Sequence, residues 1–206
     1  MQWVIETLVW LPAILIGLTF HEYAHGKAAQ LLGDNTAYYQ GRLTLNPIPH
    51  LDPVGFMMLV FFKFGWAKPV QVNPLNFKNI DRKKGMMLVS LAGPGMNILV
   101  AFAAMVLIKF TGAYQYTEWG SIAATLLAPL VYINLILAVF NLIPLPPLDG
   151  SKILAGILPD TGTKTMYALE QYAPLILLLL VFTGAAGKIL WPVVNFLFNI
   201  LYLIVF

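Results

Sequence analysis

Two histidines and a glutamate lie within five residues of one another near the N-terminus, in the run His21-Glu22-Tyr23-Ala24-His25. On a helix, positions i and i+4 share one face, so both imidazoles can present a ring nitrogen to a single cation. A catalytic zinc usually has three protein ligands and one water, whose pKa it lowers to about 7. The motif therefore predicts a metal centre that activates water. Glu22 is placed to accept the proton of that water without taking a coordination position.

The apolar setting of this motif strengthens the metal hypothesis. An HExxH run arises by chance in a chain of 206 residues with a probability of roughly 1% or below. An ionised group within a membrane-spanning helix costs on the order of 2–3 kcal/mol, even on the most lenient insertion scale. Three ionisable groups within five residues therefore need compensation, which a divalent metal supplies.

A third protein ligand must come from elsewhere, and Asp149 is the main candidate. It follows the run 141–148, Asn-Leu-Ile-Pro-Leu-Pro-Pro-Leu, whose prolines lack amide hydrogens and end a helix. Irregular backbone at membrane depth is tolerated only beside protein or a water-filled cavity, and Gly150 permits close approach there. Asp149 can equally serve as the N-cap of a helix over 151–158.

Two other residues could serve as the third ligand. Asp52 has suitable chemistry, but no motif surrounds it. His50 is the one remaining histidine, and it has no partner at i+4. This favours a polar loop residue over a ligand or a gate at the metal.

The composition indicates what kind of protein must position these residues. The chain is 59% hydrophobic and 10% charged, without cysteine, and its mean hydropathy is +0.78. A soluble domain has about 45–50% apolar and about 25% charged residues. This excludes a soluble enzyme, a disordered segment and a disulfide scaffold. The net charge of +3 is too small to indicate a nucleic-acid partner.

Four or five stretches have about the 20 apolar residues that a transmembrane helix needs. They are 3–32, 85–110, 121–143, 167–183 (interrupted by Pro174) and 188–206. The apolar stretch 51–64 would reach only about 21 Å as a helix, which favours a re-entrant segment. We expect an all-α polytopic membrane protein with about five to six transmembrane helices, a re-entrant segment and short membrane-associated β-strands.

The expected strands are 38–45, centred on Gly41, and 67–72, which alternates before an Asn-Pro pair. An exposed strand edge near the membrane can accept an extended peptide by strand addition. An ordinary surface hairpin explains the same pattern equally well.

Positive charge predicts the orientation, because cytoplasmic loops carry an excess of Lys and Arg. Six of the 12 cations lie between residues 63 and 84, whereas 111–120 has none. The first segment is therefore expected to be cytoplasmic and the second to face the other side. With 51–64 re-entrant, the histidine motif and Asp149 both fall in the cytoplasmic half of an integral protein of a prokaryotic cell membrane.

Several motifs in this order resemble the site-2 protease family of intramembrane zinc metalloproteases. The HEYAH run is followed by Asn141-x-x-Pro144 and then by Leu148-Asp149-Gly150. The run 90–97, SLAGPGMN, is similar to that family's Gly-Pro-x-x-Asn element. The runs GRLTLNP from Gly41 and GWAKPV from Gly65 resemble its minimal prokaryotic branch. Matching segments extend from residue 17 to about 152.

The resemblance implies one Zn²⁺ per chain, bound by His21, His25 and Asp149. It implies that Glu22 is the general base and that Asn141 stabilises the developing oxyanion.

Other residues of these motifs are expected to support the site. Asn97 is favoured as an interhelical hydrogen-bonding residue. Gly93 and Gly95 form part of a small-residue patch where helices approach closely. Pro94 suggests the start of a helix rather than its middle.

The implied activity is hydrolysis of single-pass membrane proteins within or near their transmembrane segments. Residues 1–206 are expected to form one domain, with a catalytic core over 1–158 and C-terminal helices over 166–206. An oligomer is possible, and the lipid bilayer and a transmembrane substrate are the expected partners. The alternative is a membrane metal transporter or a non-enzymatic metal-binding protein. A transporter needs ionisable residues along a path, whereas here they concentrate at one level.

Overall fold

Helices make up most of the chain. The computed structural model describes residues 2–62, 65–111, 118–159, 168 and 170–206. The long helices are α1 (Gln2–Leu31), α4 (Arg82–Phe110), α5 (Glu118–Asn141) and α9 (Ala185–Val205). The short elements are α2 (Thr36–Tyr39), η1 (Ile48–His50), α3 (Pro53–Phe62), η2 (Pro74–Asn76), α6 (Asp149–Ile157) and α8 (Ala173–Phe182).

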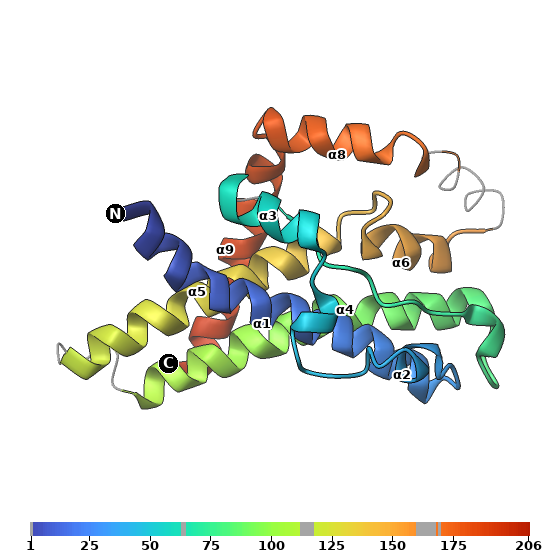
Figure 1. Ribbon diagram of the computed structural model, residues 1–206, viewed down its shortest axis with the longest axis horizontal. Helices are drawn as coiled ribbons and strands as arrows, with labels where there is room; N and C mark the ends of the chain where they lie inside the picture. The colour runs from blue at the N-terminus through green and yellow to red at the C-terminus, as the bar shows by residue number, and fades with distance from the viewer. Residues whose placement is uncertain (1, 63–64, 112–117, 160–167, 169) are drawn as a thin grey trace.

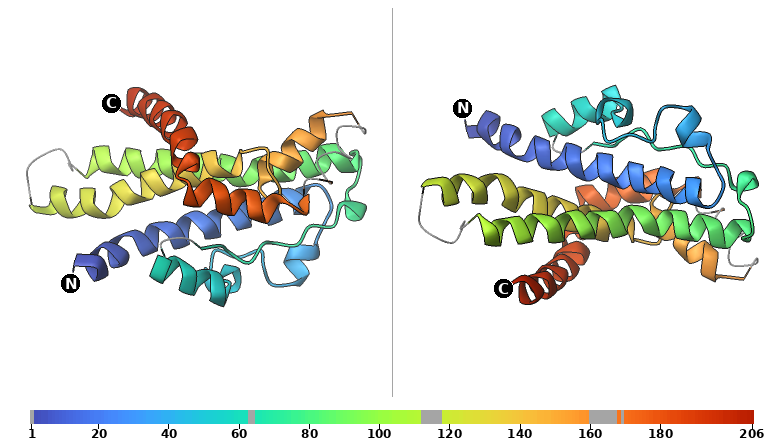
Figure 2. Two further views of the ribbon diagram at one scale, coloured as in Figure 1. Left: turned by 90° about the horizontal axis from the view of Figure 1, so that it is seen from above. Right: turned by 90° about the horizontal axis from the view of Figure 1, so that it is seen from below.

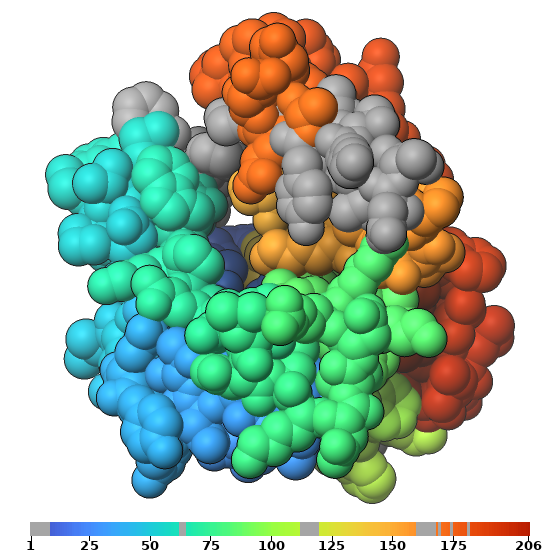
Figure 3. Space-filling view, turned by 90° about the vertical axis from the view of Figure 1, so that its right-hand side faces the viewer, coloured from blue at the N-terminus to red at the C-terminus, as the bar shows by residue number. Residues whose placement is uncertain are grey.

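The long helices are arranged in layers. Helices α1, α4 and α5 pack against one another along the long axis of the molecule (Figure 1). Both views of Figure 2 show α3 on the side of α1 that faces away from α5, and α9 on the opposite side of the α4–α5 pair. Helix α6 packs on α4. On one face the surface is hollowed between the segment after α3 and α6, with α1 visible at depth (Figure 3).

Local chemistry explains where several elements begin and end. The Asp81 carboxylate caps α4 by accepting from the amides of Lys83 and Lys84, at 3.0 and 3.2 Å. Gly33, with φ of 105°, ends α1 in a conformation that L-residues with a side chain rarely adopt. Gly184, with φ of 71°, makes the sharp turn between α8 and α9.

The apolar core joins α4, α5 and α9. Apart from one methionine, its buried members are small or branched side chains, which let the helices approach closely. They are Ala101, Ala104, Met105, Val131, Leu135, Val139, Val194, Leu201 and Val205. The outer faces are also apolar: Leu203 on α9 is 79% exposed and Phe110 on α4 is 80% exposed. Large exposed apolar surfaces of this kind suit a lipid environment.

Within the described residues, three helices are long and apolar enough to cross a membrane: α4, residues Gly120–Asn141 of α5, and α9. The prediction of a helical integral membrane protein is confirmed in this form. The expected number of five to six spans is not confirmed. Helices α3 and α8 have ten residues each, or about 15 Å, which is half of the hydrocarbon thickness. The structure does not describe residues 63–64 of the expected segment 51–64. It also does not describe residues 160–167 and 169, which include part of the expected segment 167–183.

The expected β-strands are absent from the described part of the chain. Residues 36–39 form α2, and the amides of Gly41 and Arg42 bond back to Tyr38 and Ala37. Local hydrogen bonds therefore satisfy this backbone, and Gly41, with φ of 67°, turns it. Residues 67–72 form no strand either, and Ala67 makes a single antiparallel bridge to Leu51. The alternation in 67–72 is too short to specify a sheet.

Candidate metal centre

Helix α1 presents His21 and His25 one turn apart on its buried face. Their side chains are 5% and 9% exposed, and the two Nε2 atoms are 2.9 Å apart. The rings are nearly perpendicular, at 88°. The i, i+4 spacing therefore directs both ring nitrogens to one point, as expected of a shared ligand site.

Asp149 completes this cluster from the other end of the chain. Its Oδ2 lies 3.1 Å from Nε2 of His21 and 3.1 Å from Nε2 of His25. These three residues form the group of potential metal ligands found within the described residues.

The loop between α5 and α6 holds Asp149 in place. Asp149 is the first residue of α6, and the N-cap is Leu148, so the carboxylate does not cap the helix. Gly150 packs directly on the preceding loop: a Cβ there would lie 2.3 Å from the carbonyl oxygen of Leu142 and 2.4 Å from that of Ile143. Glycine is required here because any side chain would push α6, and Asp149 with it, away from the histidines.

The hydrogen bonds of the two Nδ1 atoms determine which ring nitrogen of each neutral imidazole carries the hydrogen. Nδ1 of His21 lies 2.6 Å from Oδ1 of Asn97, and Nδ1 of His25 lies 2.7 Å from the carbonyl oxygen of Val89. These oxygens only accept, so both Nδ1 atoms carry the hydrogen and both Nε2 atoms expose a lone pair. Metal-ligating histidines are oriented in this manner in proteins.

Helix α4 supplies both of these oxygens, and Pro94 lies inside it rather than at its start. The prediction of a helix start at Pro94 is therefore wrong. A proline removes one backbone hydrogen bond, here the bond to Ser90, and opens the turn that precedes it. The carbonyl of Val89, in that same turn, accepts from His25. Transmembrane helices tolerate such a residue where neighbouring groups satisfy the freed backbone.

The donor set fits a divalent metal. Two imidazole lone pairs and a carboxylate oxygen face one another at 2.9–3.1 Å, where they repel unless a cation lies among them. Ligands of a tetrahedral zinc with bonds of 2.0–2.1 Å stand about 3.3 Å apart. The observed separations are within a few tenths of an ångström of that value.

Asn134, which the sequence analysis did not single out, extends the network behind His21. Its Nδ2 donates to the carbonyl of Leu130 at 2.8 Å, and its Oδ1 accepts from Nδ2 of Asn97 at 2.8 Å. Asn97 also donates to the carbonyl of Gly17 at 3.0 Å. Both asparagines are fully buried. A backbone carbonyl thus orients the amide of Asn134, which orients Asn97, which in turn fixes the tautomer of His21.

Gly93 lies against the imidazole rings. A Cβ at this position would stand 2.5 Å from Nε2 of His25 and 2.6 Å from Cε1 of His21. Gly95, two residues further along α4, has open space around it. The close approach expected for this glycine-rich patch is therefore specific to Gly93, and it is an approach to the candidate ligands.

Glu22 is buried beside this cluster, and the segment after α3 holds its carboxylate. Oε2 accepts from the backbone amide of Val70 at 2.7 Å. Within the described residues Oε1 makes no hydrogen bond or ion pair. The carboxylate therefore has one oxygen fixed and one available.

The other sequence candidates lie apart from the cluster. Asp52 caps α3 through the amide of Gly55 at 2.8 Å, and His50 is buried with Nε2 2.8 Å from the carbonyl of Thr44. Neither belongs to the potential ligand group. Asn141 is half-buried at the end of α5, and its Nδ2 donates to the carbonyl of Leu137 at 3.0 Å.

Fold and site together define an integral membrane protein with a buried His-His-Asp cluster between its helices. The family model described as "Peptidase family M50" matches residues 9–184. The chain belongs to this family, which is that of the site-2 proteases, so the resemblance seen in the sequence is confirmed.

Three relatives show the extent of the similarity. "Putative zinc metalloprotease YwhC" of Bacillus subtilis is 40% identical over 185 residues, covering 88% of this chain and 84% of the relative. Rip2 of Mycolicibacterium smegmatis, with the same description, is 28% identical and covers 90% and 71%. MJ0611 of Methanocaldococcus jannaschii, also so described, is 28% identical and covers 71% and 69%. No solved structure matches the chain.

Proposed function

We propose that this protein is a zinc-dependent intramembrane endopeptidase that cleaves single-pass membrane proteins within or near their transmembrane segments. The observation that carries the proposal is the cluster itself: two Nε2 atoms and one carboxylate oxygen, mutually 2.9–3.1 Å apart, with both Nδ1 atoms held by acceptors. Membership of a peptidase family, and relatives named as zinc metalloproteases, support the choice of zinc and of hydrolysis.

In this proposal His21, His25 and Asp149 hold one Zn²⁺ per chain. When bound there, the metal would supply Lewis acidity towards the scissile carbonyl and would lower the pKa of a water towards neutrality. Glu22 accepts the water proton through its available oxygen and passes it to the leaving amine. The Val70 amide keeps this carboxylate oriented through its other oxygen.

Asn141 is proposed to stabilise the developing oxyanion. Its Nδ2 carries two hydrogens, and the bond to Leu137 uses one of them. The second hydrogen can donate to the carbonyl oxygen of a substrate as negative charge accumulates there. The position of Asn141 at the end of α5, where the loop to Asp149 begins, supports this role.

We further propose that residues 1–206 act as one domain in the cell membrane of a prokaryote. Helix α1 adds a span to the three candidates, because its 30 residues reach about 45 Å, and α3 re-enters the bilayer. The cations of 63–84 support an active site towards the cytoplasmic side. A substrate helix hides its amides in hydrogen bonds, so it must unwind locally before its carbonyl can be attacked.

The test uses purified protein in liposomes with a panel of single-pass peptides, with and without a zinc chelator. Wild type is expected to cleave at least one peptide, and the chelator should abolish cleavage. The Glu22→Gln variant should keep its zinc and lose about 100-fold or more in rate, since it lacks the base. Glu118→Gln, the same substitution at the first residue of α5, is the matched control and should cleave normally.

Three outcomes contradict the proposal. The first is cleavage by Glu22→Gln at the wild-type rate, and the second is cleavage that the chelator leaves unchanged. The third is zinc flux across the liposome membrane that persists in Glu22→Gln while neither protein cleaves any peptide, which indicates a transporter.

A further inference from the structure

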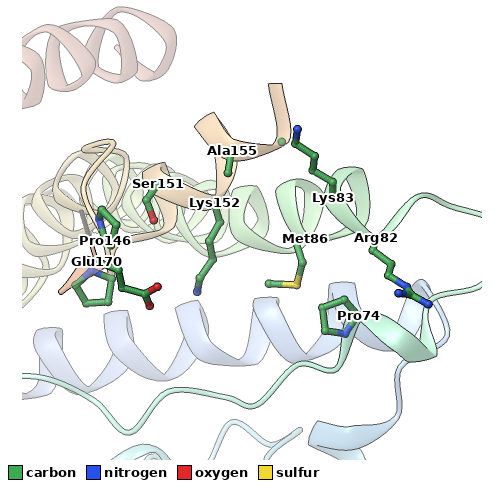
Figure 4. Close-up of a pocket in the computed structure, with 11 residues that line it drawn as sticks. Pro74, Arg82, Lys83, Met86, Pro146, Ser151, Lys152, Ala155 and Glu170 are labelled. Carbon is green, nitrogen blue, oxygen red and sulfur yellow. The ribbon is translucent and has the colours of Figure 1, made fainter. Parts of the chain in front are cut away.

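A pocket of about 540 Å³ lies between α4 and α6, and the chemistry proposed above does not use it. Arg82, Lys83 and Met86 line it from α4, and Lys152 lines it from α6 (Figure 4). It adjoins the same elements that border the hollow of Figure 3. The pocket therefore opens on the face from which α1 can be seen.

The charge of this pocket is mainly positive. Lys83 donates to the carbonyl of Leu158, at the end of α6. Arg82 and Lys152 are exposed, and neither makes an ion pair or a side-chain hydrogen bond within the part of the chain that the structure describes. Among the described lining residues there is one carboxylate, that of Glu170, which lies at the Pro146 end of the pocket (Figure 4). The described lining therefore has a net positive charge that an anionic group of a ligand can meet.

The rest of the lining is largely apolar, with Pro74, Met86 and Pro146 among its members. A free inorganic anion would gain nothing from such a lining. A ligand that combines a carboxylate with aliphatic carbons, as an acidic side chain in a peptide does, fits both parts.

The pocket shares a wall with the candidate metal centre. Pro147 and Ser151 line the pocket, and they stand on either side of Asp149 in the sequence. Lys152 begins about 4.5 Å along the α6 axis from Asp149. An extended peptide advances about 3.3 Å per residue. A side chain about two to four residues from a scissile bond at the metal centre can therefore reach the cations.

We propose that this pocket reads the charge of the substrate about two to four residues from the scissile bond, accepting Asp or Glu and rejecting Lys or Arg. This inference rests on the proposed endopeptidase function and on its orientation. Single-pass proteins usually carry Lys and Arg on their cytoplasmic flank. Repulsion from Arg82 and Lys152 excludes such flanks, so the pocket admits only the minority of membrane proteins with an acidic flank.

The test compares three peptides that differ only at this flanking position, which carries Glu, Gln or Lys. Wild type is expected to cleave the Glu peptide with a kcat/KM about tenfold higher than that of the Lys peptide. The double variant Arg82→Glu/Lys152→Glu should reverse the order. Lys188→Glu reverses one charge on α9, away from the pocket, and should keep the wild-type order. High salt should reduce the difference, because the cations are exposed.

Binding separates a failure of this inference from a failure of the proposed function. The Kd values of the same labelled peptides are measured on Glu22→Gln, with and without the double charge reversal. If wild type cleaves no peptide but the Kd still depends on the pocket charges, the proposed function fails and the charge selection holds. Equal Kd and kcat/KM values for the Glu and Lys peptides overturn the selection.

An anionic phospholipid is the competing occupant. Vesicles with and without phosphatidylglycerol distinguish it from the peptide. If the double reversal weakens association with the anionic vesicles and leaves the peptide order unchanged, the pocket holds lipid and the inference is wrong.

Discussion

Replacing Gly93 by alanine should destroy the metal centre while leaving the helix that carries it intact. The added Cβ would lie 2.5 Å from Nε2 of His25 and 2.6 Å from Cε1 of His21. Non-bonded carbon and nitrogen atoms settle about 3.5 Å apart. One or both rings must therefore move by about 1 Å, because the methyl group is fixed to the α4 backbone.

The expected effect on metal binding is large because coordination tolerates little displacement. Ligand distances in a metal site hold within about 0.2 Å, so a shift of about 1 Å removes a ligand. We expect zinc affinity to fall by about 100-fold or more, at the upper end of the losses caused by disturbing groups that orient a ligand. The substitution should not weaken α4 itself, since alanine favours a helix over glycine by about 1 kcal/mol.

Gly95→Ala is the matched control, because it makes the same change on the same helix with no atom within 4 Å. Zinc affinity is measured by competition with a chelating indicator, and helix content by circular dichroism in detergent. Gly95→Ala should bind zinc like wild type, and both variants should keep their helix content. Wild-type zinc affinity in Gly93→Ala would refute the reasoning.

Two other substitutions test buried polar side chains outside the ligand set, those of Asn134 and Asp34. Asn134→Leu removes the acceptor that orients Asn97 and should lower zinc affinity about tenfold at unchanged helix content; unchanged affinity in a zinc titration would contradict the chain of amides. Asp34, fully buried, accepts from Asn73, Asn76 and Thr36 at 2.5–3.1 Å. Burial raises the pKa of its carboxyl, but these bonds outweigh burial and lower it below 3.8. The stabilisation is therefore present above that pH and lost as the pH falls through the lowered value. Asp34→Asn should lower the melting temperature at pH 7, and its difference from wild type should shrink on acidification below about pH 4; a difference that grows there would contradict this sign.

The sequence predicts the parts of the site that depend on local geometry. The i, i+4 spacing of His21 and His25 guarantees that their rings share a face once α1 is a helix. Asp149 is different, because its distance from the histidines depends on how α6 returns to α1. The sequence alone left a helix cap as an equal alternative, and the family resemblance favoured the ligand. The structure excludes the cap, since Leu148 occupies that position.

Residues that act through tertiary contacts were harder to find. Asn134 lies within an apolar stretch of α5, and nothing in the neighbouring sequence distinguishes a network member from an isolated hydrogen-bonding residue. Its role becomes visible only when α4 brings Asn97 within 2.8 Å. Gly93 was expected in a patch of close helix approach, but the sequence could not show that the neighbouring groups are imidazoles.

The errors have physical causes of the same kind. Segment 38–45 was expected to form a strand centred on Gly41, but backbone hydrogen bonds to Ala37 and Tyr38 satisfy its amides locally instead. In soluble proteins, a proline such as Pro94 usually lies at the start of a helix. In α4 it lies mid-helix, where packing against α1 and the bond from His25 to the carbonyl of Val89 stabilise the turn that precedes it.

The most direct test of the account is to locate the metal. Crystals or frozen particles of the purified protein should contain one zinc per chain, and zinc-edge anomalous diffraction should place it among His21, His25 and Asp149. The account predicts bonds of about 2.0–2.2 Å to the two Nε2 atoms and the carboxylate oxygen. Zinc bound at other residues, or a metal-free protein that cleaves membrane peptides, would contradict it.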